Sequence, residues 1–228
     1  MLTKGACLEY FSLSEIAYAK IKEAILRHEI VPGQRLSHDE MVLRLKISQT
    51  PIREALSRLA QEGYVTRLTN RGYRVSEMSI DEVGELFGLR HALESHCLSE
   101  LLQRITPDGV SALEENIRLY KKAIAKNAPL VDRYLINKDF HMIIAKIAGN
   151  RLVSRMLDDA CEKLVLKRRI ENVTHGGFTI HRQHSEILKA IKRKDLKQAQ
   201  ELMAVHLEAI KSTLLRQIDI TTRAVRVR

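Results

Sequence analysis

The sequence is poor in the residues that mark several classes of protein. Its 228 residues include no tryptophan, only 4% aromatic residues, four prolines and ten glycines, which excludes collagen-like and low-complexity chains. The three cysteines, Cys7, Cys97 and Cys161, are scattered and form no CxxC pair, so we expect reduced thiols. No apolar run approaches the roughly 20 residues of a membrane helix, and the first residues lack an apolar signal core. We therefore expect a soluble, cytoplasmic protein with no membrane partner.

The residues that are present are typical of a folded globular protein. Apolar residues make up 45% of the chain and charged residues 29%, which argues against disorder, and the length suits two modest domains. Basic residues outnumber acidic ones by 38 to 28, for a formal net charge of +10. Because this excess is spread along the chain, nucleic-acid binding has to be argued from a local arrangement of basic groups.

The first 78 residues are predicted to form three helices followed by a hairpin. The segments Ser12–Glu15 and Ser37–Glu40 have the pattern of capping boxes, and a third helix is expected to begin around Ser48 to Pro51, because proline is tolerated in a first turn. Two strands are predicted at 64–68 and 73–76, joined by a turn. This order is typical of a winged helix-turn-helix, so we assign residues 1–78 to a DNA-binding domain.

The third predicted helix has one apolar face and one face suited to DNA. Its apolar residues recur at helical spacing, at positions 52, 55, 56 and 59. The opposite face carries Gln49, Thr50, Arg53 and Arg58. Glutamine can bond bidentately to adenine and arginine to guanine, while hydroxyl groups and a helix N-terminus suit phosphate. We also expect Arg71, at the hairpin tip, to reach the minor groove and Arg35 to bind backbone phosphate.

Four short motifs occur here in a fixed order: Pro32-Gly-Gln-Arg-Leu36, Ser48-Gln-Thr-Pro-Ile-Arg-Glu-Ala-Leu56, Glu62-Gly-Tyr-Val65 and Asn70-Arg-Gly72. Together with Val75 they resemble the DNA-binding domain of the GntR family of bacterial transcription regulators, over roughly residues 14–76. The resemblance implies that operator DNA contacts Arg35, Ser48, Gln49, Thr50, Arg53 and Gly72. Many members of the family have arginine where this chain has Gln49, which leaves the preferred base open.

Residues 79–228 are predicted to form an all-helical antiparallel bundle of about six helices, which would make the whole chain mostly α. Helix starts are indicated at Ser79 and Thr106, and breaks at 127–129, 149–150 and 192–195. Asn137 and His141 are four residues apart and therefore share a helix face. His184 and His206 lie about equally far from the turn at 192–195, so two antiparallel helices would bring them level. Spacing alone leaves two alternatives open, a metal site or four separate polar residues.

A second resemblance bears on these alternatives. The segment Glu85-Leu-Phe-Gly-Leu-Arg-His-Ala-Leu-Glu94, together with Asn137-Lys-Asp-Phe-His141, Gln183-His184 and His206-Leu207, looks like the FCD ligand-binding domain of the FadR-type branch. It implies a divalent metal, often zinc or nickel, bound by Asn137, His141, His184 and His206, with aspartate the usual residue at the first position. It also implies that the metal helps to bind a small carboxylate effector. Arg90 aligns with an arginine of the first helix and could bind that carboxylate; the alternative is a helix-surface ion pair with Glu94.

We therefore expect a homodimeric, ligand-responsive regulator that binds a palindromic operator and acts as a repressor rather than an enzyme. Three alternatives remain open. The first is a regulator that senses metal alone, and the second is a metallohydrolase with an accessory DNA-binding domain. The third is an acyl-CoA sensor of the metal-free branch, which the three aligned histidines disfavour.

Overall fold

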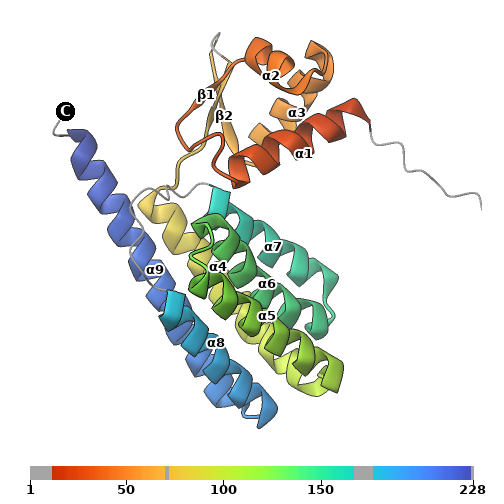
Figure 1. Cartoon of the computed structure of the whole chain (residues 1–228), viewed down its shortest axis with the longest axis vertical. Helices are drawn as coiled ribbons and strands as arrows, with labels where there is room; N and C mark the ends of the chain where they lie inside the picture. The colour runs from red at the N-terminus through yellow and green to blue at the C-terminus, as the bar shows by residue number, and fades with distance from the viewer. Residues whose placement is uncertain (1–11, 70–71, 167–176, 227–228) are drawn as a thin grey trace, which may run out of the picture. The chain divides into compact units, whose positions relative to one another are not determined.

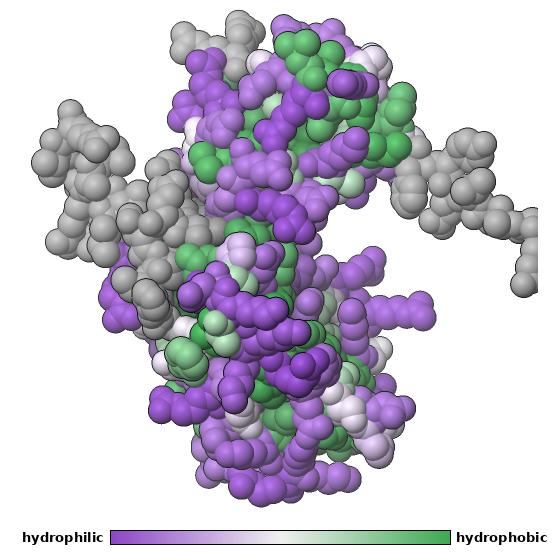
Figure 2. Space-filling model, viewed as in Figure 1, coloured by the Kyte–Doolittle hydropathy of each residue, from purple (hydrophilic) through white to green (hydrophobic). Residues whose placement is uncertain are grey.

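The computed structural model describes residues 12–69, 72–166 and 177–226. The chain divides into two compact units, residues 1–77 and residues 78–228. Within the described ranges, no helix combines the length and the apolar character needed to cross a membrane. Hydrophilic side chains cover most of the face shown in Figure 2, with apolar side chains visible between them.

The described residues of the N-terminal unit form three helices and three short strands (Figure 1): α1 Leu13–Leu26, β1 Arg35–Leu36, α2 His38–Leu45, α3 Gln49–Gln61, β2 Val65–Leu68 and β3 Gly72–Val75. The predicted capping box at α1 is confirmed, because the Ser12 hydroxyl accepts the Glu15 N–H while the Glu15 carboxylate accepts the Ser12 N–H. At α2 the Ser37 hydroxyl accepts the Glu40 N–H at 3.1 Å. Local sequence signals therefore set where these helices begin.

The sheet has one strand more than the sequence predicts. It is antiparallel, with the order β1-β3-β2, and Arg35 and Leu36 of β1 pair with Arg74 and Tyr73 of β3. A strand of two residues is too short to show the alternation by which strands are recognised. Arg35, which the sequence predicts to bind backbone phosphate, thus lies on a strand that pairs with β3.

Gly72, the first residue of β3, lies close to the backbone of β1. Its φ is +79°, and a Cβ atom at this position would lie 2.5 Å from the carbonyl oxygen of Leu36. Any other residue would have to adopt a left-handed conformation and also push the β1 backbone away. The fold itself therefore requires glycine at this position, independently of the DNA contact that the family resemblance implies.

The core of the N-terminal unit fixes which face of α3 points outward. Ile52, Leu56 and Leu59 are fully buried, and they pack with α1, whose Ile21 and Ile25 are 1% exposed. Each such side chain stabilises the fold by about 1.5–3 kcal/mol. The apolar face predicted for this helix is confirmed, so the opposite face is left to solvent.

The C-terminal unit is the helical bundle predicted from the sequence (Figure 1). Its described helices are α4 Ile80–Arg104, α5 Pro107–Ala125, α6 Leu130–Ala148, α7 Arg151–Leu166, α8 Gly177–Lys192 and α9 Leu196–Arg226. Thr106 caps α5 with Pro107 in its first turn, and Gly149 ends α6 in a left-handed conformation. Helix α4 packs against α6, α7 and α9, while α8 packs against α5 and α9.

Polar and charged side chains are enclosed in this bundle together with the apolar ones. Those that are at most 5% exposed among the described residues are Arg90, Glu94, Asn116, His141, His184 and His206. Burying such groups costs free energy unless each finds a partner. The partners of the three histidines and of Arg90 define the buried site.

Candidate DNA-reading element and buried histidine cluster

The N-terminal turn of α3 carries the polar groups that the sequence predicts for DNA reading. Ser48, Gln49, Thr50 and Arg53 are exposed. Ser48 is the N-cap residue, yet its side chain makes no capping hydrogen bond. The helix start therefore presents unsatisfied N–H groups and two hydroxyl groups beside a glutamine and an arginine, which suits phosphate and base edges.

The other predicted DNA contacts differ in how the structure places them. Arg35 is exposed on β1, and Gly72 begins β3. Arg71 lies outside the described residues, so its contact remains a prediction. Arg58 has two partners inside the unit, because its guanidinium lies 4.0 Å from the Tyr18 ring centroid and its Nε donates to Glu62 at 3.0 Å. Arg58 thus joins α3 to α1 and is a weaker candidate for a DNA contact than Arg53.

Three buried imidazoles converge in the C-terminal unit. His141 comes from α6, His184 from α8 and His206 from α9, and each is at most 1% exposed. One ligand atom from each ring lies within 4.8 Å of the others. The Nε2 atom of His206 is 3.3 Å from that of His184 and 3.2 Å from that of His141. The structure thus brings His184 and His206 level, as their spacing around the turn predicts.

Hydrogen bonds at the far side of two rings bear on which nitrogen carries the proton, and at His141 the carboxylate partner fixes it, because a carboxylate can only accept. The Nδ1–H of His141 donates to Glu94 Oε2 at 2.6 Å, and that of His206 donates to Gln183 Oε1 at 3.0 Å. In the neutral imidazoles the two Nε2 atoms therefore hold lone pairs. With both protons on Nδ1, two lone pairs face each other at 3.2 Å, an arrangement that a cation between them would stabilise.

The third ring is held by packing. His184 stacks on Phe140, with ring centroids 3.8 Å apart and an interplanar angle of 10°, and its Nδ1 atom is buried without a hydrogen-bond partner. Three imidazoles with converging Nε2 atoms are a donor set that suits zinc and other divalent transition metals. The residues present therefore fit the divalent metal that the resemblance to FCD domains implies.

Burial keeps these imidazoles neutral. Desolvation lowers the pKa of His184 and of His206 well below 6.5, and the neighbouring imidazoles lower both further. The pKa of His141 is also lowered by burial, although Glu94 pulls it upward. Burial alone would raise the pKa of Glu94, but Arg90 and His141 outweigh it and hold this pKa at about 2. At neutral pH the cluster is therefore ready to coordinate a cation.

These shifts predict that the metal-free protein loses stability in mild acid. Because the folded pKa values of His184 and His206 are depressed, the unfolded chain takes up protons below pH ~6.5 that the folded cluster does not. Each such imidazole should cost about 1.4 kcal/mol per pH unit below that value. Urea unfolding of chelator-treated protein from about pH 7 to about pH 5 measures this slope, and His206→Gln should make it shallower. A flat profile would contradict the assignment.

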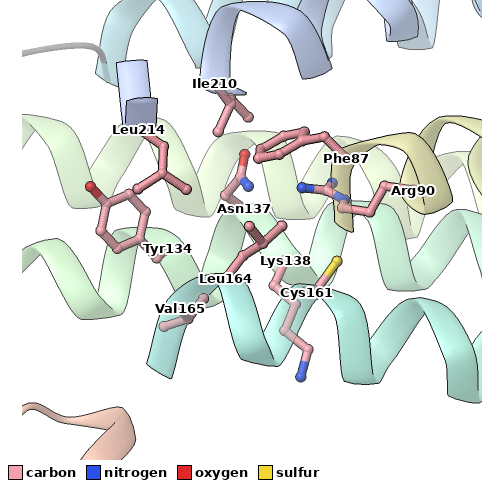
Figure 3. Close-up of a pocket in the computed structure, with 10 residues that line it drawn as sticks. All are labelled: Phe87, Arg90, Tyr134, Asn137, Lys138, Cys161, Leu164, Val165, Ile210 and Leu214. Carbon is pink, nitrogen blue, oxygen red and sulfur yellow. The ribbon is translucent and has the colours of Figure 1, made fainter. Parts of the chain in front are cut away.

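A small cavity adjoins the part of the bundle that holds Arg90. Its volume is about 40 Å³, which is room for a few water molecules, and Figure 3 shows the side chains that line it. Arg90 Nη2 and Asn137 Oδ1 both lie in buried positions without a hydrogen-bond partner. A donor and an acceptor that both lack partners beside one cavity indicate a place for a polar ligand.

Arg90 forms the ion pair that the sequence offers as one alternative, and one of its donors stays without a partner. Its Nε donates to Glu94 Oε1 at 2.8 Å, so the expected i,i+4 ion pair is present. The pair is buried rather than on the helix surface, because both side chains are at most 4% exposed. Since Nη2 is unpaired, the guanidinium retains a donor for a carboxylate.

Two residues that shape the site were not found from the sequence. The sequence indicates Glu94 only as a partner of Arg90, and Gln183 only as part of a motif. Glu94 lies 47 residues before His141, so nothing local connects them. The one available signal was that metal-binding imidazoles usually donate their second N–H to a carboxylate or carbonyl oxygen, which is a reason to search for such partners once the histidines are chosen.

The chain joins a winged helix-turn-helix to a helical domain that encloses a buried polar site. This combination defines a class of proteins, the transcription regulators that join DNA binding to a small-molecule site. The chain belongs to the GntR family of these regulators. Residues 13–75 match the family described as bacterial regulatory proteins, gntR family, and residues 85–209 match the FCD domain. It is a transcriptional regulator and not an enzyme, which removes the metallohydrolase alternative.

Named relatives agree with this assignment. The chain is 31% identical to an uncharacterized HTH-type transcriptional regulator in an unstable DNA locus of Streptomyces ambofaciens, over 85% of this chain and 81% of that protein. It is 27% identical to the HTH-type transcriptional repressor RspR of Escherichia coli, over 88% of each. The solved structure of E. coli McbR/YncC covers 91% of this chain and 99% of its own, with a TM-score of 0.77 and 20% identity. At this sequence identity, the structural similarity shows only that the two proteins share a fold.

Proposed function

We propose that the protein is a cytoplasmic, homodimeric repressor that binds a palindromic operator and senses a small carboxylate at a divalent metal in the FCD domain. The observation that carries the proposal is the convergence of three buried Nε2 atoms in the domain attached to the winged helix. Similarity to the repressor RspR supports repression as the sign of regulation.

In the DNA-binding half, each polar group has a distinct task. Arg53 and Gln49 read base edges in the major groove, while Ser48 and Thr50 bind phosphate at the start of α3. Arg35, on the strand beside the wing, binds backbone phosphate. The exposure of these side chains and the burial of the opposite face of α3 support this assignment.

In the FCD half, His141, His184 and His206 hold zinc or nickel, and Asn137 Oδ1 is the fourth protein ligand. Asn137 lies one turn before His141 on α6, and its Oδ1 atom is buried without a partner. All four ligands are neutral, so the metal retains its full positive charge. An anionic effector supplies the missing charge.

Arg90 binds the carboxylate of that effector from the cavity side. The unpaired Nη2 atom of Arg90 and the small volume of the cavity favour a short organic acid. A regulator that senses the metal alone would have no use for these unpaired polar groups. The organic effector is therefore the better-supported alternative.

Exchanging Asn137 for aspartate tests the proposal. Asn137→Asp adds a negative ligand, so it should tighten nickel or zinc and weaken a carboxylate that neutralises the same charge. Calorimetric titration of metal, and then of a panel of short organic acids, into both variants measures the two affinities. Repeating the acid titrations with and without operator DNA measures the coupling between effector binding and operator binding. Linkage is reciprocal, so an effector that changes operator affinity must bind with a different affinity when DNA is present.

The matched control is Asn150→Asp, which makes the same chemical change at an exposed helix cap. The Asn150 side chain accepts the N–H groups of Leu152 and Val153, and aspartate caps helices equally well. Its metal and acid affinities should equal those of the wild type. The effector site would lie elsewhere if an acid bound Asn137→Asp and the wild type with equal affinity, or if operator DNA did not change its affinity.

A further inference from the structure

Glu94 makes one contact with each of two functional groups. Its Oε1 atom accepts a hydrogen bond from Arg90 Nε at 2.8 Å, and its Oε2 atom accepts one from His141 Nδ1 at 2.6 Å. The side chain is 1% exposed, so water does not compete for either oxygen. Both ends of the carboxylate are therefore fixed, and the group cannot rotate without breaking a charged contact.

The three imidazoles differ in what holds their Nδ1 atoms. His141 has a carboxylate, His206 has the neutral amide of Gln183, and His184 has no hydrogen-bond partner on this atom. A carboxylate at Nδ1–H fixes the tautomer and makes the opposite nitrogen a stronger electron donor. Of the three Nε2 atoms, that of His141 is thus the strongest ligand.

Building on the proposed metal site, we infer that Glu94 is a positioning residue: it fixes the tautomer and basicity of His141, and Arg90 holds it in place. Arg90 also lines the effector cavity. The effector arginine and a metal ligand therefore share a single carboxylate.

A charge-neutral double variant tests this role. Glu94→Gln alone would leave Arg90 as an unpaired buried charge and destabilise the fold. Arg90→Gln/Glu94→Gln removes one charge of each sign and keeps the shapes similar. The amide no longer forces His141 into one tautomer, so the affinity for Ni²⁺ should fall about 10- to 100-fold. Calorimetry with Ni²⁺ alone measures it, and ¹⁵N NMR of the histidine rings in the metal-free chain should show His141 changing from one tautomer to a mixture.

The matched control is Glu100→Gln/Arg104→Gln, which removes the same kind of i,i+4 pair from the same helix. That pair is 2.9 Å long and its arginine side chain is 55% exposed. It should leave the Ni²⁺ affinity and the His141 tautomer unchanged. Wild-type affinity, or an unchanged tautomer, in Arg90→Gln/Glu94→Gln would overturn the role of Glu94. Absence of Ni²⁺ binding by the wild type would instead refute the proposed metal site, and the tautomer measurement would still test Glu94.

Discussion

Replacing His184 with alanine is expected to abolish metal binding. The side chain is one of three converging imidazoles and is fully buried against Phe140, so no solvent-exposed group can take its place. Metal at about 100 times its dissociation constant should stabilise the wild type by roughly 2.7 kcal/mol and the variant by nothing. Metal analysis of the purified protein, together with thermal unfolding with and without added zinc, measures both effects.

His181→Ala is the control for this experiment. His181 lies on the same helix, one turn earlier, and is partly exposed, so its loss should leave metal content at the wild-type level. The thermal measurement also separates metal loss from damage to the fold, because the metal-free forms can be compared directly. Equal metal content in His184→Ala and the wild type would refute the site.

Replacing Arg53 with alanine should weaken operator binding by about 1–3 kcal/mol and relax the base preference at one position, because a bidentate contact to guanine is lost. Arg35→Ala should act differently. It should weaken binding to all sequences alike and reduce the slope of log affinity against log salt by about one. Gel-shift titrations on operator and unrelated DNA across a salt series distinguish the two.

The control for charge is Arg27→Ala. Arg27 lies just after α1 and bonds to Glu23, so this variant loses one positive charge from the same unit without touching the exposed face of α3. Its effect on operator binding should be small. If Arg53→Ala and Arg35→Ala also bind like the wild type, the DNA-reading role of this surface is wrong.

The parts of the fold that could be predicted are those that local signals encode. Serine caps mark the starts of α1, α2 and α4, and the apolar spacing at Ile52, Leu56 and Leu59 fixes the buried face of α3. Strand β1 could not be predicted, because its two residues show no sequence pattern of their own. They form a strand only through their pairing with β3.

The candidate site divides in the same way. His184 and His206 could be placed together because a short turn makes their helices antiparallel. Residues equally far from that turn in the sequence then lie at the same level along the two helix axes. Glu94 and Gln183 could not be assigned as partners of the histidines, because those contacts depend on how side chains of different helices meet. The Arg58 contact with Tyr18 likewise joins two helices and has no local signature.

The burial of the three imidazoles has a consequence for the timescale of metal exchange. The ligands come from α6, α8 and α9, and none is more than 1% exposed. If the proposed metal binds here, its release requires these helices to separate locally, so the rate at which the bundle opens limits how fast the ion leaves. Such an ion would exchange slowly. In the proposed function, the rapidly changing signal would then be the anion, with the metal serving as a long-lived part of its receptor.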